Sequence, residues 1–294
     1  MLLRLAPVLF VLIWSTGWIT ARAAAPVADP LAFLFLRFAF AGALLAIIIV
    51  ISGVSMPRTG SAWLHGLASG VLLHAIYLGG VWVSIDEGLA TPVSGLVAAL
   101  QPLLTAILAV SLLSEQLTRL QWFGLMLGFV GLSLALLPDL ATLQGEALLG
   151  NAGLVGLNVM AIVSVTLGSL YQKRFLPNGD LRAISLLQYI GAALVIGPLA
   201  LATGGTDVTL SWYSVGVMAW AVFGLSFAAI GLFLLLIRHG AVSRAATLIY
   251  LIPPLVAIES FFLFGEALSS IAIFGMLVTV FGVYLVNRKS TARV

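Results

Sequence analysis

Three ionisable side chains lie inside long apolar stretches of this sequence: Arg37, His74 and Glu259. Because a titratable group is costly in lipid, each of them is expected to face protein or water and is a candidate functional position. The chemistry that they offer is binding or proton transfer. Catalysis would need several acids, histidines or thiols converging on one place, and these three residues are far apart in sequence.

The cysteine and histidine content argues against metal and cofactor chemistry. The chain has no cysteine, so it has no thiolate ligand or nucleophile. His65, His74 and His239 have no ligand-like spacing. We therefore expect no metal, no cofactor and no enzymatic activity. The net charge of +3 comes from cations in short loops, which predicts a membrane partner and no nucleic acid.

The composition is that of a polytopic membrane protein. Of 294 residues, 62% are hydrophobic and 8% are charged, and the mean hydropathy is +1.20. A membrane-crossing helix needs about 20 apolar residues. Ten stretches meet this requirement: residues 6–24, 31–52, 63–84, 89–113, 120–138, 152–172, 183–203, 213–236, 243–264 and 270–287.

The first stretch also resembles a secretory signal, with an early Arg4, an apolar run and then small residues. Two tryptophans in the apolar run favour a retained span. With the N-terminus placed in the cytoplasm, 11 of the 13 Lys and Arg residues fall on that side, and Arg22 falls outside. The positive-inside rule therefore predicts that both termini are cytoplasmic.

The sequence repeats itself with an offset of 151 residues. Between Leu100 and Gly131, 11 of 32 positions are identical to those 151 residues later. The same register pairs Asp29 with Asp180, so the first span has a counterpart that is no signal peptide. Each copy holds five spans, an odd number, so the copies face opposite ways. This predicts an all-α fold of ten transmembrane helices in two inverted five-helix repeats, residues 1–143 and 152–294.

Pro102 and Pro253 occupy equivalent places near the centres of the fourth and ninth spans. A proline frees the carbonyl four residues earlier and bends the helix, and the carbonyl then needs a partner or water. The bends either line a cavity or are tolerated structural kinks. Glu115 and Glu266 lie just past these spans and are interpreted as structural, capping the helix that follows, where Thr118 and Gln121 also form a capping box.

Polar and aromatic side chains at mid-depth are the candidates for substrate binding. His74 and Tyr77 are three residues apart, which places them on one face of an α-helix. His74 is either a site residue or a core histidine bonded to a neighbouring carbonyl. Trp14 lies too deep to be an interfacial anchor. The predicted substrate-binding residues are His74, Tyr77, Trp14, Trp18, Tyr250, Gln101 and Asn158.

Glu259 and Arg37 lie at similar depth in the ninth and second spans. Glu259 is particular to one half, because Leu108 occupies the equivalent place. It is either a proton site or partner of an amine, or else an outer-vestibule residue or partner of Arg37. Its cost in lipid requires only that it avoids the bilayer.

The repeated "P…GE.L" pattern, the ten spans, "IWSTGW" and the later "LRF" (Leu36–Phe38) resemble the drug/metabolite transporter superfamily of EamA type. Around "WSTGW" and "HAIYLGG" (His74–Gly80) the first half is most similar to the YddG aromatic amino-acid exporters. This resemblance implies a ten-helix basket whose central cavity is lined by spans one, three, four, six, eight and nine. It also implies export across the bacterial inner membrane.

The sequence therefore predicts a secondary transporter that exports small amphipathic metabolites, foremost aromatic amino acids. A broad drug or purine exporter of the same superfamily is the alternative. An enzyme would need converging acids or metal ligands, and a scaffold would need no inverted symmetry. The expected partners are a small-molecule substrate and the lipid bilayer, and one chain of ten helices can enclose a cavity as a monomer.

Overall fold

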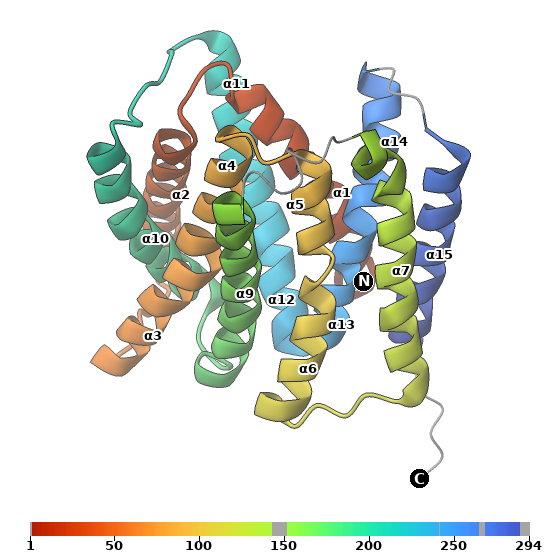
Figure 1. The fold of residues 1–294 in the computed structure, drawn as a ribbon. Coiled ribbons are helices and arrows are strands. Elements are labelled where there is room, and N and C mark those ends of the chain that lie inside the picture. The colour runs from red at the N-terminus through yellow and green to blue at the C-terminus, as the bar shows by residue number, and fades with distance from the viewer. Residues whose placement is uncertain (1, 143–151, 241, 265–267, 289–294) are drawn as a thin grey trace.

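The computed structural model describes residues 2–142, 152–240, 242–264 and 268–288. This part of the chain holds ten helical segments that are long and apolar enough to cross a membrane. In the same residues the extended structure is limited to one isolated bridge, between Ala28 and Val208. The predicted all-helical fold with ten spans is confirmed (Figure 1).

Six spans are single helices and four are interrupted. The single helices are α1 (Leu2–Ala24), α2 (Pro30–Ser52), α7 (Arg119–Thr142), α9 (Ala152–Phe175), α10 (Leu181–Thr203) and α15 (Ser270–Asn287). The third span is α3 (Gly60–Gly70), the π-helix η1 (Val71–Ile76) and α4 (Tyr77–Asp86), and the fourth is α5 (Thr91–Ala98) and α6 (Gln101–Leu113). The eighth is α11 (Trp212–Trp220), the π-helix η2 (Ala221–Ala229) and α12 (Ile230–His239), and the ninth is α13 (Val242–Thr247), the 3-10 helix η3 (Leu248–Leu251) and α14 (Ile252–Phe264).

Equivalent aspartates begin α2 and α10. Asp29 accepts hydrogen bonds from the backbone N–H groups of Leu31 and Ala32 at 2.8 and 3.3 Å. Asp180 accepts one from Arg182 N–H at 2.9 Å. Such bonds satisfy donors that a helix start leaves free and place a negative charge at the positive end of the dipole. Both helix starts are thus set by local sequence, and they lie 151 residues apart.

The helices that correspond in the two halves pack against each other at opposite ends of the molecule. In Figure 1, α2 and α10 lie at the left and α7 and α15 at the right, with the other spans between them. Phe38 of α2 and Tyr189 of α10, equivalent positions, stack with ring centroids 6.1 Å apart. This mutual packing of counterparts is what a two-fold relation between halves produces.

Glycines bring α7 and α15 into backbone contact. A Cβ atom on Gly131 would lie 2.5 Å from the Thr279 nitrogen and 2.8 Å from the Gly275 oxygen. A Cβ on Gly282 would lie 2.5 Å from the Gly128 nitrogen. Small residues allow such close approach of membrane helices. We call this contact, made by Gly124, Gly128, Gly131, Gly275 and Gly282, the glycine seam.

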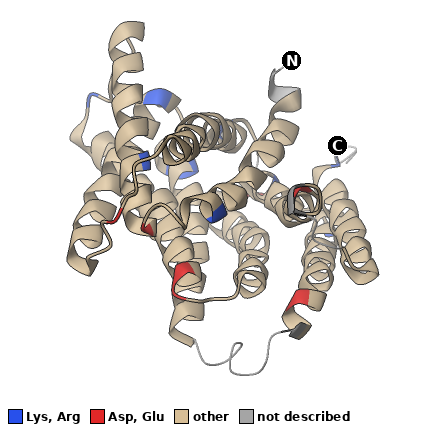
Figure 2. Cartoon of the chain, turned by 90° about the horizontal axis from the view of Figure 1, so that it is seen from above, with Lys and Arg blue, Asp and Glu red and all other residues tan. Residues whose placement is uncertain are grey.

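An even number of spans places the start of α1 and the end of α15 on one side, here called the terminal face; the other side is the opposite face. Charged residues are sparse, and most lie near helix ends and in loops (Figure 2). Glu266 lies outside the described residues, as does the stretch 143–151 that would join the two repeats. The domain boundaries at 143 and 152 therefore stay a prediction.

Candidate functional site

The interrupted spans carry unusual backbone at mid-depth. The π-helices η1 and η2 occupy residues 71–76 and 221–229, which correspond with an offset of 151 residues. In the fourth span the helix is interrupted between Ala98 and Gln101, just before Pro102, and in the ninth η3 precedes Pro253 by two residues. Short π-helical segments occur frequently at functional sites. Both halves thus bend or widen the spans that surround the molecular centre.

The π-helix corrects one step of the sequence argument. The shared face of His74 and Tyr77 was expected from an uninterrupted α-helix. His74 instead lies inside η1, and Tyr77 begins α4. Hydrogen bonds that close five residues apart widen the turn, so the α-helical spacing rule does not apply across this junction. The proximity of the two side chains rests on their common neighbour Arg37, described next.

Arg37 is buried among polar groups of both halves. Its side chain is 4% exposed, and its Nε donates to Ser226 Oγ in η2 at 2.9 Å. The guanidinium interacts electrostatically with the phenols of Tyr77 and Tyr189 and with the His74 ring. Tyr189 O–H donates to the Ser226 carbonyl at 2.5 Å. Sequence reasoning named Arg37, His74 and Tyr77 but missed Tyr189 and Ser226.

His74 and Gln188 extend this group toward α3 and α9. The His74 ring lies 5.2 Å from Tyr189, centroid to centroid. Gln188 Nε2 donates to Ser69 Oγ at 3.0 Å and to Gln172 Oε1 at 2.6 Å. The Gln188 side chain interacts with the His74 ring, yet neither Gln188 Oε1 nor His74 Nε2 has a partner at ordinary hydrogen-bond distance among the described residues. We call the group Arg37, His74, Tyr77, Gln188, Tyr189 and Ser226 the polar seam.

Gln188 was absent from the sequence argument, although a signal for it existed. It lies 151 residues after Arg37, so the two occupy equivalent positions in the second and seventh spans. An inverted repeat brings equivalent positions near its axis to the same region. The partners of an isolated intramembrane arginine can thus be sought at its counterpart in the other half.

In a region separate from Arg37, Asn158 connects three spans, the third, the fourth and the sixth. Its Nδ2 donates to Ser84 Oγ at 3.0 Å and to Ser94 Oγ at 2.9 Å, while Oδ1 has no partner in the described part of the chain. Gln101 is 1% exposed at the start of α6. Buried amides of this kind fix helix positions whether or not they bind a ligand.

Trp14, Tyr250 and Glu259 lie outside both the polar seam and the contacts of Asn158. Trp14 packs against Phe10 and Phe233 with centroids 5.0 and 5.5 Å apart. Trp18 is half-buried one turn further along α1. Tyr250 is 1% exposed against Gly128, and its hydroxyl has no partner among the described residues.

Glu259 Oε1 accepts from Ser15 Oγ at 2.7 Å. In the part of the chain described, Glu259 and Arg37 form no ion pair, so their suggested partnership is corrected. Each charge instead has a serine neighbour, Ser15 and Ser226 respectively. The predicted binding residues are therefore spread over several buried groups, and the structure places no single contact set around all of them.

At the terminal face, side-chain bonds occur both within the second half and between the halves. Within the second half, Lys173 Nζ donates to the carbonyls of Ile237, Arg238 and Gly240 at 2.7, 2.9 and 3.0 Å, at the end of α12. Glu115 accepts from the Val242 N–H at 2.7 Å and from the Ser243 hydroxyl at 2.6 Å. The expectation that Glu115 caps the next helix was thus wrong in its target, because it caps α13 of the other half.

The start of α7 has its own cap. The Thr118 N–H donates to Gln121 Oε1 at 2.9 Å, and the Gln121 N–H donates to Thr118 Oγ1 at 3.3 Å. The capping box predicted from these two residues is confirmed. With this local pair satisfying the helix start, the Glu115 carboxylate is free to bond across the halves.

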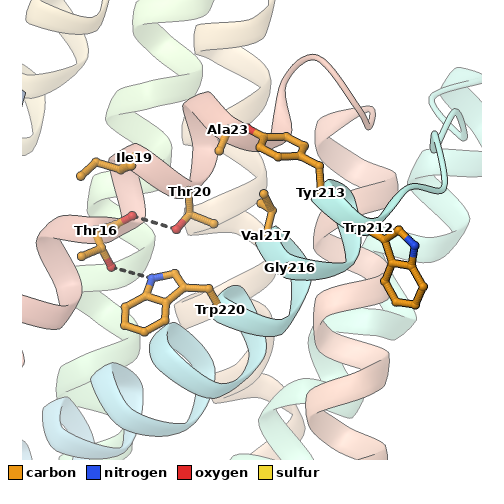
Figure 3. Close-up of a pocket in the computed structure, with 9 residues that line it drawn as sticks. All are labelled: Thr16, Ile19, Thr20, Ala23, Trp212, Tyr213, Gly216, Val217 and Trp220. Carbon is orange, nitrogen blue, oxygen red and sulfur yellow. Dashed lines mark hydrogen bonds between the residues drawn. The ribbon is translucent and has the colours of Figure 1, made fainter. Parts of the chain in front are cut away.

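A separate cavity of about 470 Å³ opens between α1 and α11 near the opposite face (Figure 3). Trp220 Nε1 donates to Thr16 Oγ1 across its floor at 2.9 Å, and Trp212, 91% exposed, points away from it. Its lining is Thr16, Ile19, Thr20, Ala23, Trp212, Tyr213, Gly216, Val217 and Trp220. None of the predicted site residues lines this cavity, which is mainly apolar.

Comparison with known proteins identifies similar transporters over nearly the whole chain. The profile of the EamA-like transporter family matches residues 4–137 and 153–288. The chain is 26% identical over 291 residues to the uncharacterized transporter YvbV of Bacillus subtilis, covering 96% of this chain and 90% of that protein. It is 29% identical to the uncharacterized inner membrane transporter YedA of Escherichia coli K12, covering 97% and 91%.

A solved crystal structure superposes with a TM-score of 0.80 at 20% identity, over 96% of this chain and 95% of that chain. At this identity the likeness concerns the fold alone. The family profile, by contrast, covers both halves and most of each. On that ground, and with ten spans of the expected kind, this chain belongs to the EamA-like transporter family.

Proposed function

We propose that this protein is a secondary transporter that exports small amphipathic metabolites, foremost aromatic amino acids, by alternating access between its two halves. The observation that carries the proposal is the polar seam, a buried group with a cation, amides and aromatic hydroxyls contributed by both halves. A zwitterion that leaves water needs donors and acceptors to replace its hydration. Aromatic rings beside them suit an aromatic side chain.

The direct test is transport by the purified protein in liposomes. Vesicles are loaded with labelled amino acids, nucleosides or cationic dyes, and efflux is measured with and without a pH gradient. Preferential efflux of phenylalanine, tyrosine or tryptophan supports the proposal. Efflux of purine nucleosides or dyes alone would favour the broader exporter, and no efflux of any compound would contradict transport.

Within this proposal His74 and Tyr77 contact the substrate. His74→Ala and Tyr77→Ala should each lower phenylalanine transport about fivefold, since a ring contact or a hydrogen bond contributes about 1 kcal/mol. Trp212→Ala is the control, because Trp212 is 91% exposed at the membrane surface. Normal transport by both well-folded variants would return His74 and Tyr77 to a packing role.

We further propose that both termini are cytoplasmic in a bacterial inner membrane. The absence of native cysteine permits a clean test. Single cysteines at positions 58 and 139 should react with an impermeant maleimide from opposite sides of right-side-out and inverted vesicles. Reaction of both from one side would contradict the inverted arrangement.

Transport is proposed to run down the metabolite gradient without proton coupling. Glu259 lies within α14, where its Oε1 accepts from Ser15 Oγ and its Oε2 has no partner among the described residues. One isolated carboxylate of this kind provides no relay of titratable groups across the bilayer. Glu259→Gln should therefore leave the response to a pH gradient unchanged. Uphill, proton-driven export that this substitution abolishes would overturn the uncoupled mechanism.

A further inference from the structure

The starting point is an arginine buried without a counter-charge. Arg37 is 4% exposed in the second span. No carboxylate lies within ion-pair distance of it in the part of the chain that the structure describes. Buried charges are normally paired, because removing an ion from water is costly. An arginine retained in this position without a protein anion is a candidate for pairing with an anion that arrives from outside the chain.

The groups around Arg37 leave part of its hydrogen-bonding capacity unused. Nε donates to Ser226 Oγ, and this is its one hydrogen bond to a described residue. Tyr189 O–H is committed to the Ser226 carbonyl. A guanidinium carries five N–H donors in a planar fork. With Nε fixed by Ser226, the four donors on the two terminal nitrogens remain for a planar, bidentate acceptor, and a carboxylate has that shape.

The surroundings supply the complementary half of an amino acid. Gln188 interacts with the His74 ring, but neither Gln188 Oε1 nor His74 Nε2 has a partner at ordinary hydrogen-bond distance among the described residues. Each atom is therefore available to bond a ligand that comes between them. Gln188 occupies the position equivalent to Arg37 in the other half. A carbonyl oxygen at Gln188 can accept from an ammonium group, whereas Arg37 can only donate. Arg37 therefore suits the carboxylate of a zwitterion, and the equivalent position Gln188 suits its ammonium group.

The local backbone supports a ligand in this place. Ser226, which fixes Arg37 Nε, lies in the π-helix η2, and His74 lies in the π-helix η1. Both segments face α2 or α10. Because π-helical turns in membrane helices are irregular and widened, they can adjust around a bound group more readily than an uninterrupted α-helix. Each flank of the polar seam thus has such a segment.

We propose that Arg37 is the residue that selects substrates with a carboxylate, and that Gln188 accepts from their amino group. This rests on the transport function proposed above and narrows its substrates to carboxylates. The contact forms when the halves part enough for the substrate to reach α2. In the structure as described, Ser226 holds the guanidinium through Nε, and the phenols of Tyr77 and Tyr189 lie close enough to interact with it electrostatically.

The experiment compares phenylalanine with phenylalaninamide, which lacks the anion, and with 3-phenylpropionate, which lacks the amine. Binding is measured as ligand-induced thermal stabilisation of the detergent-purified protein, and transport as counterflow of labelled phenylalanine in liposomes. The wild type should bind phenylalanine at least about tenfold more tightly than the amide. Arg37→Gln should weaken phenylalanine binding by about tenfold or more and change amide binding by less than about twofold.

Gln188→Leu should weaken phenylalanine binding and leave binding of 3-phenylpropionate unchanged. Arg182→Gln is the matched control, because Arg182 is an exposed arginine paired with Asp180. Should Arg37→Gln fail to fold, Ser226→Ala retains the charge and removes its anchor. This variant should weaken phenylalanine binding selectively over the amide, by about fivefold.

The outcomes separate this inference from the proposed function. If the wild type binds the acid and the amide equally, or if folded Arg37→Gln or Ser226→Ala discriminates as the wild type does, the inference is overturned while transport stands. If the wild type exports nucleosides or dyes but neither binds nor moves any carboxylate, the inference also falls. Arg37-dependent binding of phenylalanine without counterflow would instead support the inference and contradict the transport proposal.

Discussion

The two seams join the same pair of repeats with different groups. At the glycine seam, α7 and α15 meet through backbone, and a Cβ on Gly131 would lie 2.5 Å from the Thr279 nitrogen. At the polar seam, Phe38 and Tyr189 stack across the interface beside Arg37 and Gln188. Backbone contact is equally close there, because a Cβ on Gly70 would clash with the Gln188 carbonyl. The glycine seam thus depends mainly on close packing, whereas the polar seam combines close packing with buried hydrogen bonds that can exchange partners.

The largest expected effect comes from breaking the glycine seam. Gly131→Ala places a Cβ against backbone atoms of α15, so the helices must separate, at a cost of about 3 kcal/mol. Gly156→Ala in α9 is the control, because nothing lies within 4 Å of its Cβ. There the better helix propensity of alanine should leave stability unchanged or raise it by up to about 1 kcal/mol. Thermal unfolding in detergent measures both, and equal midpoints for the two variants would contradict a tight seam.

A smaller effect is expected at the terminal face, where Glu115 of the first half bonds to the start of α13 in the second half. Glu115→Ala removes a carboxylate that accepts from the Val242 N–H and from the Ser243 hydroxyl. Hydrogen bonds to a charged group contribute about 1.5–3 kcal/mol. Maleimide labelling of a cysteine at position 238 should become severalfold faster, with Arg119→Ala, at an exposed charged residue of the same face, as control. Labelling no faster than in the control would show that Glu115 does not hold this face closed.

A substitution in the polar seam should have a smaller effect than those at the glycine seam and at the terminal face. Tyr189→Phe removes one hydrogen bond, to the Ser226 carbonyl, and keeps the ring that stacks on Phe38. The expected loss is about 1 kcal/mol, seen as a lower unfolding midpoint. Tyr284→Phe, an exposed tyrosine of α15, should change nothing. A loss as large as that of Gly131→Ala would show that the polar seam is as fixed as the glycine seam.

The smallest expected effect is a pH dependence at the start of α10. Hydrogen bonds from Arg182 hold the pKa of the Asp180 carboxyl below its ordinary value, which in the unfolded chain is about 3.9. Since the folded pKa is the lower one, this contribution is present above about pH 4 and is lost as pH falls through the folded pKa. The pair is exposed, so solvent screening keeps the effect small. The difference in unfolding midpoint between wild type and Asp180→Asn should shrink below about pH 4, and a constant difference would exclude this origin.

The ten spans and the internal repeat could be predicted because they depend on local composition and on similarity along the chain. The capping box of Thr118 and Gln121 was predicted for the same reason, because its bonds reach only three residues. The caps at Asp29 and Asp180 were not named in advance, although their bonds are equally local. Such features need no knowledge of how the helices are rotated or packed.

The partners of the buried groups could not be predicted in the same way. Glu115 caps a helix start 127 residues away, and Ser226 lies 189 residues from Arg37. These contacts depend on the rotation of each span about its axis, which hydropathy leaves undefined. The π-helices were missed for a related reason, since a π-turn is set by packing more than by residue type. Arg37, His74 and Tyr77 could be named from the sequence as polar residues at mid-depth, and Gln188 could have been found through its equivalence with Arg37.

The matching π-helices bear on the ancestry of the protein. A π-turn is an α-helix that has accommodated an additional residue. Here it occurs at residues 71–76 and, within 221–229, at the corresponding place in the second half. An irregularity that was present before a five-helix unit was duplicated would appear in both copies at this offset. We infer that the π-turn is of that age, and that the two copies have since acquired different side chains around it.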